Sequence, residues 1–196
     1  WVFGANFLLM HRVGGLRAEA DHHVLTVDDG TEISGRTIVL ATGVEYARLG
    51  VESVEALVGA GVYYGSSVGE AQACAGSHAF VIGGGNSAGQ AALYLARHAA
   101  QVSILVRSDS LAASMSVYLR DEIAAAANVD VQYRTQVVGG GGKGRLDHLV
   151  LRDVDSGAER TVAAGALFIL IGARPRTDWL PAGVSRRPSP RWPSRP

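Results

Sequence analysis

A glycine-rich turn at residues 83–88 is the feature of this sequence that most directly predicts chemistry. The run Gly83-Gly84-Gly85-Asn86-Ser87-Ala88 has the form G-x-G-x-x-A and follows a short apolar segment. In such turns the first glycine permits a tight bend, the second lets a pyrophosphate approach the backbone, and the small last residue lets helix and strand pack closely. Free N–H groups and the helix dipole then hold the phosphates, with Asn86 and Ser87 offering donors or capping the helix. We therefore predict a dinucleotide site, against the alternative of a glycine turn without a ligand.

The residue that ends the next apolar segment predicts which nucleotide is bound. NAD sites usually carry Asp or Glu about 20 residues beyond the turn, where the carboxylate binds the ribose 2′-hydroxyl. Here the segment 102–106 is followed by Arg107. Its guanidinium could pair with a 2′-phosphate through charge-assisted hydrogen bonds, and Arg120 would contribute if its helix points toward the site. NADPH is thus favoured over NADH, and the alternative for Arg107 is a solvated surface side chain.

Apolar patterns indicate the elements that must position this turn. Residues 79–82 are wholly apolar, as expected for a strand covered on both faces. Apolar residues at three- and four-residue spacing predict a helix over 87–99. Strands are predicted at 102–106 and 129–133, with a helix from the capping residue Ser116 to about residue 127 between them. A parallel Rossmann sheet requires this order of elements, so the predicted fold class is α/β.

The segments before and after this unit are strand-rich. Residues 24–27 and 31–33 predict a hairpin around Asp28-Asp29-Gly30, and residues 36–40 predict a buried strand.

Beyond the unit, four glycines at 139–142 predict a flexible connection, followed by a hairpin around Ser156-Gly157 and a buried strand at 166–171. The proline-rich residues 185–196 predict a disordered tail, because they cannot build a core.

Composition excludes several classes of protein. The chain has 196 residues, of which 47% are hydrophobic and 18% charged, and its formal net charge is +0. Global disorder and a general affinity for nucleic acid are therefore not expected. The single cysteine, Cys74, gives no disulfide framework and fits a cytoplasmic setting. We predict no membrane span, because no apolar stretch is long enough, and Trp1 in place of Met suggests a fragment.

Three motifs in order carry a family resemblance. They are Thr37-Ile38-Val39-Leu40-Ala41-Thr42-Gly43, the glycine turn, and Phe168-Ile169-Leu170-Ile171-Gly172-Ala173-Arg174-Pro175. Together they resemble the thioredoxin reductase-like branch of the FAD- and NAD(P)-dependent pyridine nucleotide-disulfide oxidoreductases. In that family an NADPH domain is inserted in an FAD domain, and hydride passes from NADPH to the flavin and on to an acceptor. The resemblance implies that both domains have Rossmann-type folds, with a complete NADP domain and an incomplete FAD domain here.

The resemblance also implies a division of the chain. Residues 1–45 would end the first FAD-domain segment, 56–165 would form the NAD(P)H domain, and 166–184 would begin the second FAD-domain segment. Ala41, Thr42, Gly43, Gly172 and Ala173 would lie near the domain junction. The implied partners are a nicotinamide nucleotide, an electron acceptor of unknown identity and a possible second copy of the chain.

Two features depart from the family pattern. The family's FAD pyrophosphate turn and its later Gly-Asp segment are not found in these residues, so we do not expect this chain alone to hold FAD. The redox-active Cys-x-x-Cys is also absent, and disulfide exchange needs a thiol pair. Cys74 is expected to be a small buried hydrophobe. Either the parent reduces another acceptor, or it has lost activity, and a non-catalytic NADP(H)-binding module or an inactive fragment remains an alternative.

A further motif favours a different class of enzyme. Gly65-Ser66-Ser67-Val68-Gly69 matches the nucleophile elbow G-x-S-x-G, with Ser67 as nucleophile and His148 as a triad partner. The strand before it is very short, and no oxyanion-hole glycine run precedes it. A serine hydrolase is therefore the minor alternative.

Overall fold

The computed structural model describes residues 4–65 and 68–184. The chain divides into two compact units. One unit spans residues 46–173, and the other combines residues up to 45 with those from 174 onward. In the parts of the chain that the structure describes, no helix has the length and apolar character needed to cross a membrane.

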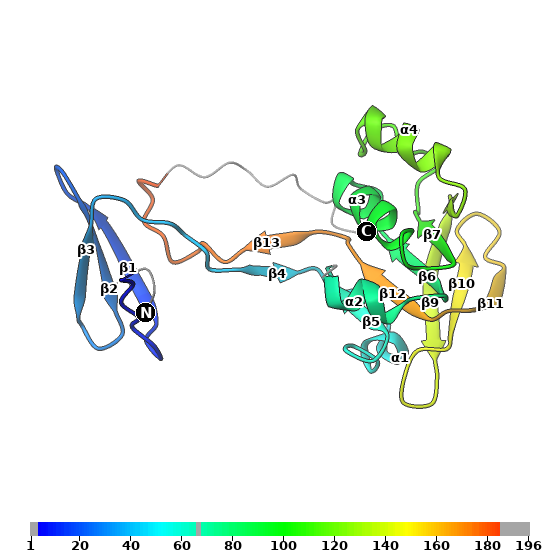
Figure 1. Cartoon of the computed structure of the whole chain (residues 1–196), viewed down its shortest axis with the longest axis horizontal. Helices are drawn as coiled ribbons and strands as arrows, with labels where there is room; N and C mark the ends of the chain where they lie inside the picture. The colour runs from blue at the N-terminus through cyan, green and yellow to red at the C-terminus, as the bar shows by residue number, and fades with distance from the viewer. Residues whose placement is uncertain (1–3, 66–67, 185–196) are drawn as a thin grey trace. The chain divides into compact units, whose positions relative to one another are not determined.

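A five-stranded parallel sheet is the centre of the 46–173 unit (Figure 1). Its strands, in spatial order, are β5 (Val62–Tyr64), β12 (Ala166–Ile169), β6 (His78–Ile82), β7 (Gln101–Leu105) and β8 (Val129–Gln132). All four strand pairs are parallel. The predicted order of strand, helix, strand, helix and strand from β6 to β8 is confirmed.

Helices cover one face of this sheet. They are α2 (Val68–Ala73), α3 (Asn86–Leu95) and α4 (Val117–Ala125), while the short α1 (Glu52–Glu55) precedes β5. Helix α3 forms because small apolar residues recur along one side, and Ala88, Ala92 and Leu95 are fully buried. It ends at Leu95, before the predicted residue 99, because the following residues tighten into i→i−3 hydrogen bonds such as His98 N–H to Leu95 O, 2.9 Å.

Alternation along the sheet strands produces a core on each side. Val81, Ile104 and Phe168 pack with residues of α2, α3 and α4. Their neighbours Phe80 and Leu167 point to the opposite face and pack with residues of α1, β9 and β10. The sheet is therefore buried on both faces, which explains why its strands read as continuous apolar runs.

A three-stranded antiparallel sheet covers the second face. Its order is β11 (Glu159–Ala163), β10 (His148–Asp153) and β9 (Thr135–Gly141). The predicted hairpin is confirmed as β10 and β11. The prediction of a flexible connection at 139–142 is wrong, because Gly139, Gly140 and Gly141 pair with β10. Their lack of side chains suits a close approach, since a Cβ on Gly140 would lie 3.1 Å from the His148 carbonyl oxygen and 3.2 Å from Val54.

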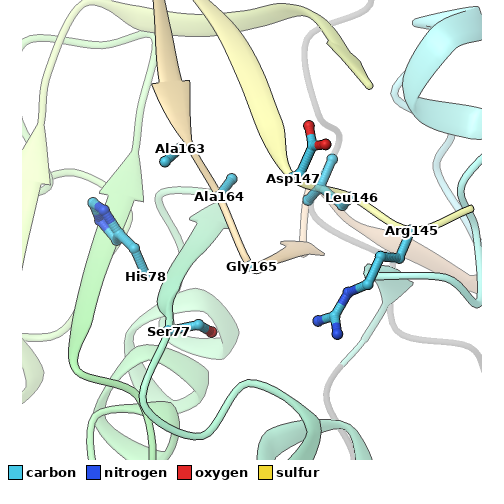
Figure 2. Close-up of a pocket in the computed structure, with 8 residues that line it drawn as sticks. All are labelled: Ser77, His78, Arg145, Leu146, Asp147, Ala163, Ala164 and Gly165. Carbon is cyan, nitrogen blue, oxygen red and sulfur yellow. The ribbon is translucent and has the colours of Figure 1, made fainter. Parts of the chain in front are cut away.

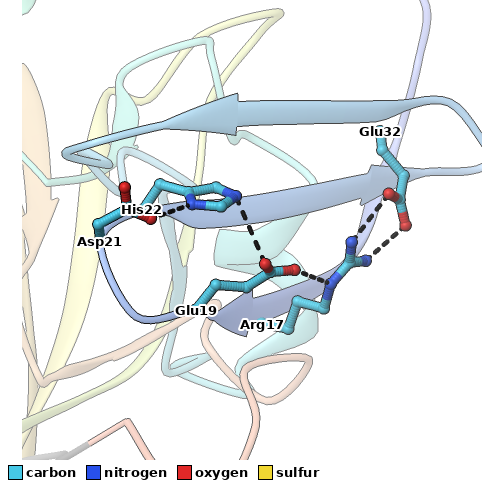
Figure 3. Close-up of polar contacts among 5 residues, drawn as sticks. All are labelled: Arg17, Glu19, Asp21, His22 and Glu32. Atoms are coloured by element: carbon cyan, nitrogen blue, oxygen red, sulfur yellow. Dashed lines mark hydrogen bonds and ion pairs between the residues drawn. The ribbon is translucent and has the colours of Figure 1, made fainter.

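The other unit contains a separate antiparallel sheet. Its strands β1 (Val13–Ala18), β2 (His23–Val27) and β3 (Glu32–Gly35) lie in that order, and the predicted hairpin around Gly30 is confirmed as β2 and β3. Arg17 on β1 pairs with Glu32 on β3 and with Glu19 (Figure 3). Hydrogen bonds from Arg17 hold the pKa of Glu32 below its ordinary value, but both side chains are about half exposed, so the pair contributes little to stability.

The prediction of a buried strand at 36–40 is wrong. These residues form no strand, and Val39 is 86% exposed. An apolar run becomes a buried strand only where other strands pair with it, and no described residue pairs with this run. The chain then continues through β4 (Val44–Tyr46), which pairs with β13 (Ala173–Pro175). The predicted disordered tail, 185–196, lies outside the described residues.

Candidate nucleotide-binding site

Gly83 makes the sharp turn that leads from β6 into α3. Its φ of +146° is unfavourable for residues with side chains, and a Cβ there would lie 2.5 Å from the Leu170 carbonyl oxygen and 3.1 Å from the Ala88 side chain. Its N–H donates to the Leu105 carbonyl, 3.2 Å. The turn therefore packs between β7 and the end of β12, and only glycine can occupy position 83.

The start of α3 presents free backbone donors at this turn. Gly85 is the N-cap residue, with φ −94° and ψ 176°, and no side chain makes a cap hydrogen bond there. Asn86 and Ser87, the next two residues, are exposed. The first N–H groups of a helix have no partners within it, so this end of α3 can accept an anion.

Ala88 lets the helix approach the strand closely. It is fully buried, and its Cβ occupies the space beside the Gly83 backbone. A larger side chain would push α3 away from β6. The structure thus brings together the six residues that the sequence predicted for the phosphate turn.

The loop before α4 contacts the same turn. Ser114 Oγ donates to the Gly84 carbonyl, 2.7 Å, and the Ser116 N–H donates to Asn86 Oδ1, 2.8 Å. The Asn86 side-chain oxygen therefore binds the loop before α4. No side chain makes a cap hydrogen bond in α3, so the predicted capping role of Asn86 is wrong. The sequence interpretation missed Ser114, although a loop between the second strand and second helix of such a unit must pass near the first turn.

Arg107 and Arg120 lie on two different elements. Arg107 is exposed and follows β7 by two residues, at the carboxyl edge of the sheet where the glycine turn also lies. Arg120 is part of α4 and is half-buried, and its Nε has no hydrogen-bond partner among the described residues. Ser116 is the N-cap residue of α4 as predicted, but its hydroxyl makes no cap hydrogen bond.

The residues predicted near a domain junction lie where the chain passes between its two units. Ala41, Thr42 and Gly43 are exposed, and Thr42 Oγ1 donates to the Arg176 carbonyl, 2.8 Å. Gly172 and Ala173, also exposed, end the 46–173 unit, and the Gly172 carbonyl accepts the Ala47 N–H, 3.0 Å. Thr42 and Gly172 are thus each held by a contact within their own unit.

A hydrogen-bonded cluster surrounds Tyr64 at the carboxyl end of β5. The Tyr64 hydroxyl donates to Glu55 Oε1, 2.5 Å, and accepts the Leu49 N–H, 2.9 Å. Arg48 pairs with Glu55, 3.1 Å, and lies over the Tyr64 ring. Burial raises the pKa of Glu55, but hydrogen bonds from Tyr64, Gly50 and Arg48 outweigh it, so the pKa lies below its ordinary value. This cluster fixes the segment that enters the 46–173 unit.

A pocket of about 350 Å³ lies near the amino-terminal ends of β6 and β12, whereas the glycine turn lies at the carboxyl end of β6 (Figure 2). Its lining comes from the loops before β6, β10 and β12, and includes Ser77, His78, Arg145 and Asp147. His78 begins β6, whereas the glycine turn follows the end of β6. The pocket is therefore no part of the nucleotide site.

Cys74 and Ser67 do not contribute to the site described here. Cys74 is fully buried, its thiol donates to the Ala71 carbonyl, 3.0 Å, and burial raises its pKa. A thiol with these properties is inert, as expected from the sequence. Ser67, the nucleophile of the hydrolase alternative, lies outside the described residues.

Comparisons with known proteins agree with this geometry. The sequence profile of the pyridine nucleotide-disulphide oxidoreductases matches residues 3–189. A thioredoxin reductase of Streptomyces clavuligerus is 32% identical over 184 residues, which cover 90% of this chain and 53% of that protein. A thioredoxin reductase of Neurospora crassa is 36% identical over 150 residues, which cover 72% of this chain and 42% of that protein.

Solved structures show the same relationship. The thioredoxin reductase of Streptococcus pyogenes superposes with a TM-score of 0.70 and 27% identity, covering 85% of this chain and 54% of that one. The chain thus spans about half the length of these thioredoxin reductases. The predicted family and the Rossmann-type fold are confirmed: the chain belongs to the pyridine nucleotide-disulphide oxidoreductase family and is thioredoxin reductase-like.

Proposed function

We propose that the 46–173 unit binds NADPH at the Gly83–Ala88 turn and serves as the nucleotide domain of a flavin-dependent oxidoreductase. The observation that carries this proposal is the position of Gly83 between β6, β7 and β12, where a side chain would collide with the Leu170 carbonyl. Such a turn brings the backbone close to a ligand while leaving the N-terminus of α3 open. Both features are what a pyrophosphate needs.

The residues present fit a dinucleotide. The backbone at Gly84 and Gly85 carries no side chain that would block the phosphates, and the exposed Asn86 and Ser87 begin the helix that would hold them. Arg107, at the end of β7, supplies the positive charge for a 2′-phosphate. NADPH bound in this way would supply a hydride, while this chain's residues bind and orient it.

Flavin is a different case. The proposal assigns the glycine turn between β6 and α3 to NADPH. Ala41, Thr42 and Gly43, which the family resemblance places near the domain junction, are exposed and do not form a turn of this kind. FAD would therefore need residues beyond those described, and we derive no step through it.

We propose no identity for the electron acceptor and exclude only one way of reducing it, disulfide exchange through a thiol pair of this chain. The chain has one cysteine, which is buried, so these residues carry no thiol pair for disulfide exchange. Disulfide exchange by the residues of this chain is therefore not part of the proposal. A cytoplasmic location and a homodimer remain part of the proposal, as does the family's use of both cofactors.

The domain assignment is also a proposal. We assign residues 1–45 and 174–184 to the FAD domain and the 46–173 unit to the NADPH domain. This unit reaches beyond the sequence-based limits of 56 and 165, because β12 joins the same sheet as β6. The chain passes from one unit to the other near residues 45 and 174.

The proposal is tested by calorimetric titration of the purified chain with NADPH and NADH, with an absorbance scan for flavin. We expect saturable NADPH binding and weaker NADH binding. A folded chain that binds neither nucleotide contradicts the proposal. Flavin that copurifies, and is bleached by NADPH without air, would show that the chain also works as an oxidoreductase.

A further inference from the structure

Two polar side-chain atoms of α4 and its N-cap residue are buried without hydrogen-bond partners among the described residues. They are Oγ of Ser116 and Nε of Arg120, for which the described residues supply no partner. Buried polar groups in folded proteins are paired in the great majority of cases. Two unpaired groups one helical turn apart therefore require an explanation, and a ligand that pairs with both is one.

Both atoms lie on the same face of α4. The backbone N–H of Arg120 donates to the backbone carbonyl of Ser116, 3.2 Å, so the two residues are one helical turn apart. Ile123 follows on this face, and its Cδ1 lies 3.4 Å from the position of a Cβ on Gly89 of α3. The face that carries Ser116 and Arg120 is therefore turned toward α3.

This face of α4 begins at the phosphate turn itself. The Ser116 N–H is bound to the side chain of Asn86, the first residue of α3. Ser114, two residues earlier, is bound to the Gly84 carbonyl. Ser116, which carries the unpaired hydroxyl, is thus joined by its backbone N–H to the helix end that would hold the pyrophosphate.

The chemistry of the two groups selects an anion. A guanidinium Nε can only donate, and a serine hydroxyl can donate as well. Phosphate oxygens accept charge-assisted hydrogen bonds from such donors.

We propose that Ser116 and Arg120 form a second phosphate subsite, which donates to a phosphate oxygen of the nucleotide bound at the glycine turn. The inference rests on the proposed function, since it requires that nucleotide. The phosphate is either the pyrophosphate or the 2′-phosphate. Arg107 at the end of β7 would then act together with this subsite and not alone.

The test compares Ser116→Ala and Arg120→Gln with the wild-type chain, by titration with NADPH and NADH. Arg97→Gln is the matched control, because it removes the same charge from an exposed residue beyond the far end of α3. We expect NADPH affinity to fall about tenfold for Ser116→Ala and further for Arg120→Gln, as for lost hydrogen bonds to a charged group. Arg97→Gln should bind as the wild type does.

The second nucleotide identifies which phosphate is bound. Equal losses for NADPH and NADH assign the subsite to the pyrophosphate, and a loss for NADPH alone assigns it to the 2′-phosphate. Unchanged affinity of both variants for both nucleotides overturns the subsite while leaving the proposed function intact. A wild-type chain that binds neither nucleotide overturns both.

Thermal unfolding without ligand separates binding from a structural role. Because the Ser116 hydroxyl has no partner in the free chain, Ser116→Ala should not lower the Tm. A lower Tm with unchanged affinity would make the hydroxyl a structural group and would overturn the proposal.

Discussion

The carbonyl oxygen of Leu170 lies 2.5 Å from the position that a Cβ atom on Gly83 would occupy. This relationship joins the end of β12 to the turn after β6, and it makes the turn intolerant of any side chain. Gly83→Ala should therefore force the backbone of Leu170 or of the turn to move. We expect a loss of about 3 kcal/mol in the free energy of unfolding, from backbone strain and displacement together, and a loss of NADPH binding.

Gly84→Ala is the matched control for stability. A Cβ at Gly84 would meet Ser114 Oγ at 3.4 Å, a distance of ordinary contact. Chemical denaturation of both variants checks the prediction. Equal stability of Gly83→Ala and Gly84→Ala would mean that the Leu170 carbonyl does not constrain the turn.

Arg107→Ala is predicted to weaken NADPH binding far more than NADH binding. A guanidinium pairs with the 2′-phosphate that only NADPH carries, so its loss should cost roughly tenfold to a hundredfold in affinity for NADPH. Titration of wild type and variant with both nucleotides measures this. Equal weakening for NADPH and NADH would refute the role given to Arg107.

The sequence was sufficient for the part of the fold that positions this site. The turn at residues 83–88, β6, β7, β8, α3 and α4 were all predicted, because both faces of the sheet are buried and the helices carry regular apolar faces. These signals are local, whereas the collision that requires glycine at position 83 comes from Leu170, which is distant in the sequence. The nucleotide itself stays a prediction from Arg107.

The errors share a physical cause. Gly139–Gly141 form a strand because β10 lies beside them, and residues 36–40 form none because no described strand pairs with them. Strand formation depends on partners distant in the sequence, which composition does not reveal. Ser114 and Ser116 were not predicted as site residues for the same reason, since their contacts to Gly84 and Asn86 join separate elements.

Glu55 should make the stability of the 46–173 unit depend on pH in the acid range. Hydrogen bonds from Tyr64 and Arg48 overcome burial and lower the pKa of Glu55 in the folded chain. A lowered carboxyl pKa stabilises the folded state above the unfolded pKa, which is about 4.3. This contribution is lost as the pH falls through the folded pKa.

Glu55→Gln is therefore expected to lower the Tm at pH 7, and the difference from wild type should close toward pH 3. Glu52→Gln removes the same charge from an exposed position of α1 and should cost less at pH 7. A difference between wild type and Glu55→Gln that stays constant from pH 7 to pH 3 would contradict the argument.

His78 should make the stability of the 46–173 unit depend on pH at higher values than Glu55 does. Its Nε2 lies 2.8 Å from Ser103 Oγ, which donates to Asp130, 2.7 Å, and its ring stacks on Phe80. Burial lowers the pKa of His78, and Asp130 opposes this only in part. The folded chain therefore favours neutral imidazole. The resulting stability is complete above the unfolded pKa of about 6.5 and is lost as the pH falls toward the folded value.

His78→Gln keeps a side chain that can bond to Ser103 but cannot take up a proton. We expect the Tm of the wild-type chain to fall more than that of His78→Gln between pH 7.5 and pH 5.5. Arg145 and Asp147 line the pocket next to His78 and are unchanged in both chains, so their effects cancel in the comparison. Parallel Tm curves over this range would show that protonation of His78 costs the folded chain nothing, and that burial does not control its charge.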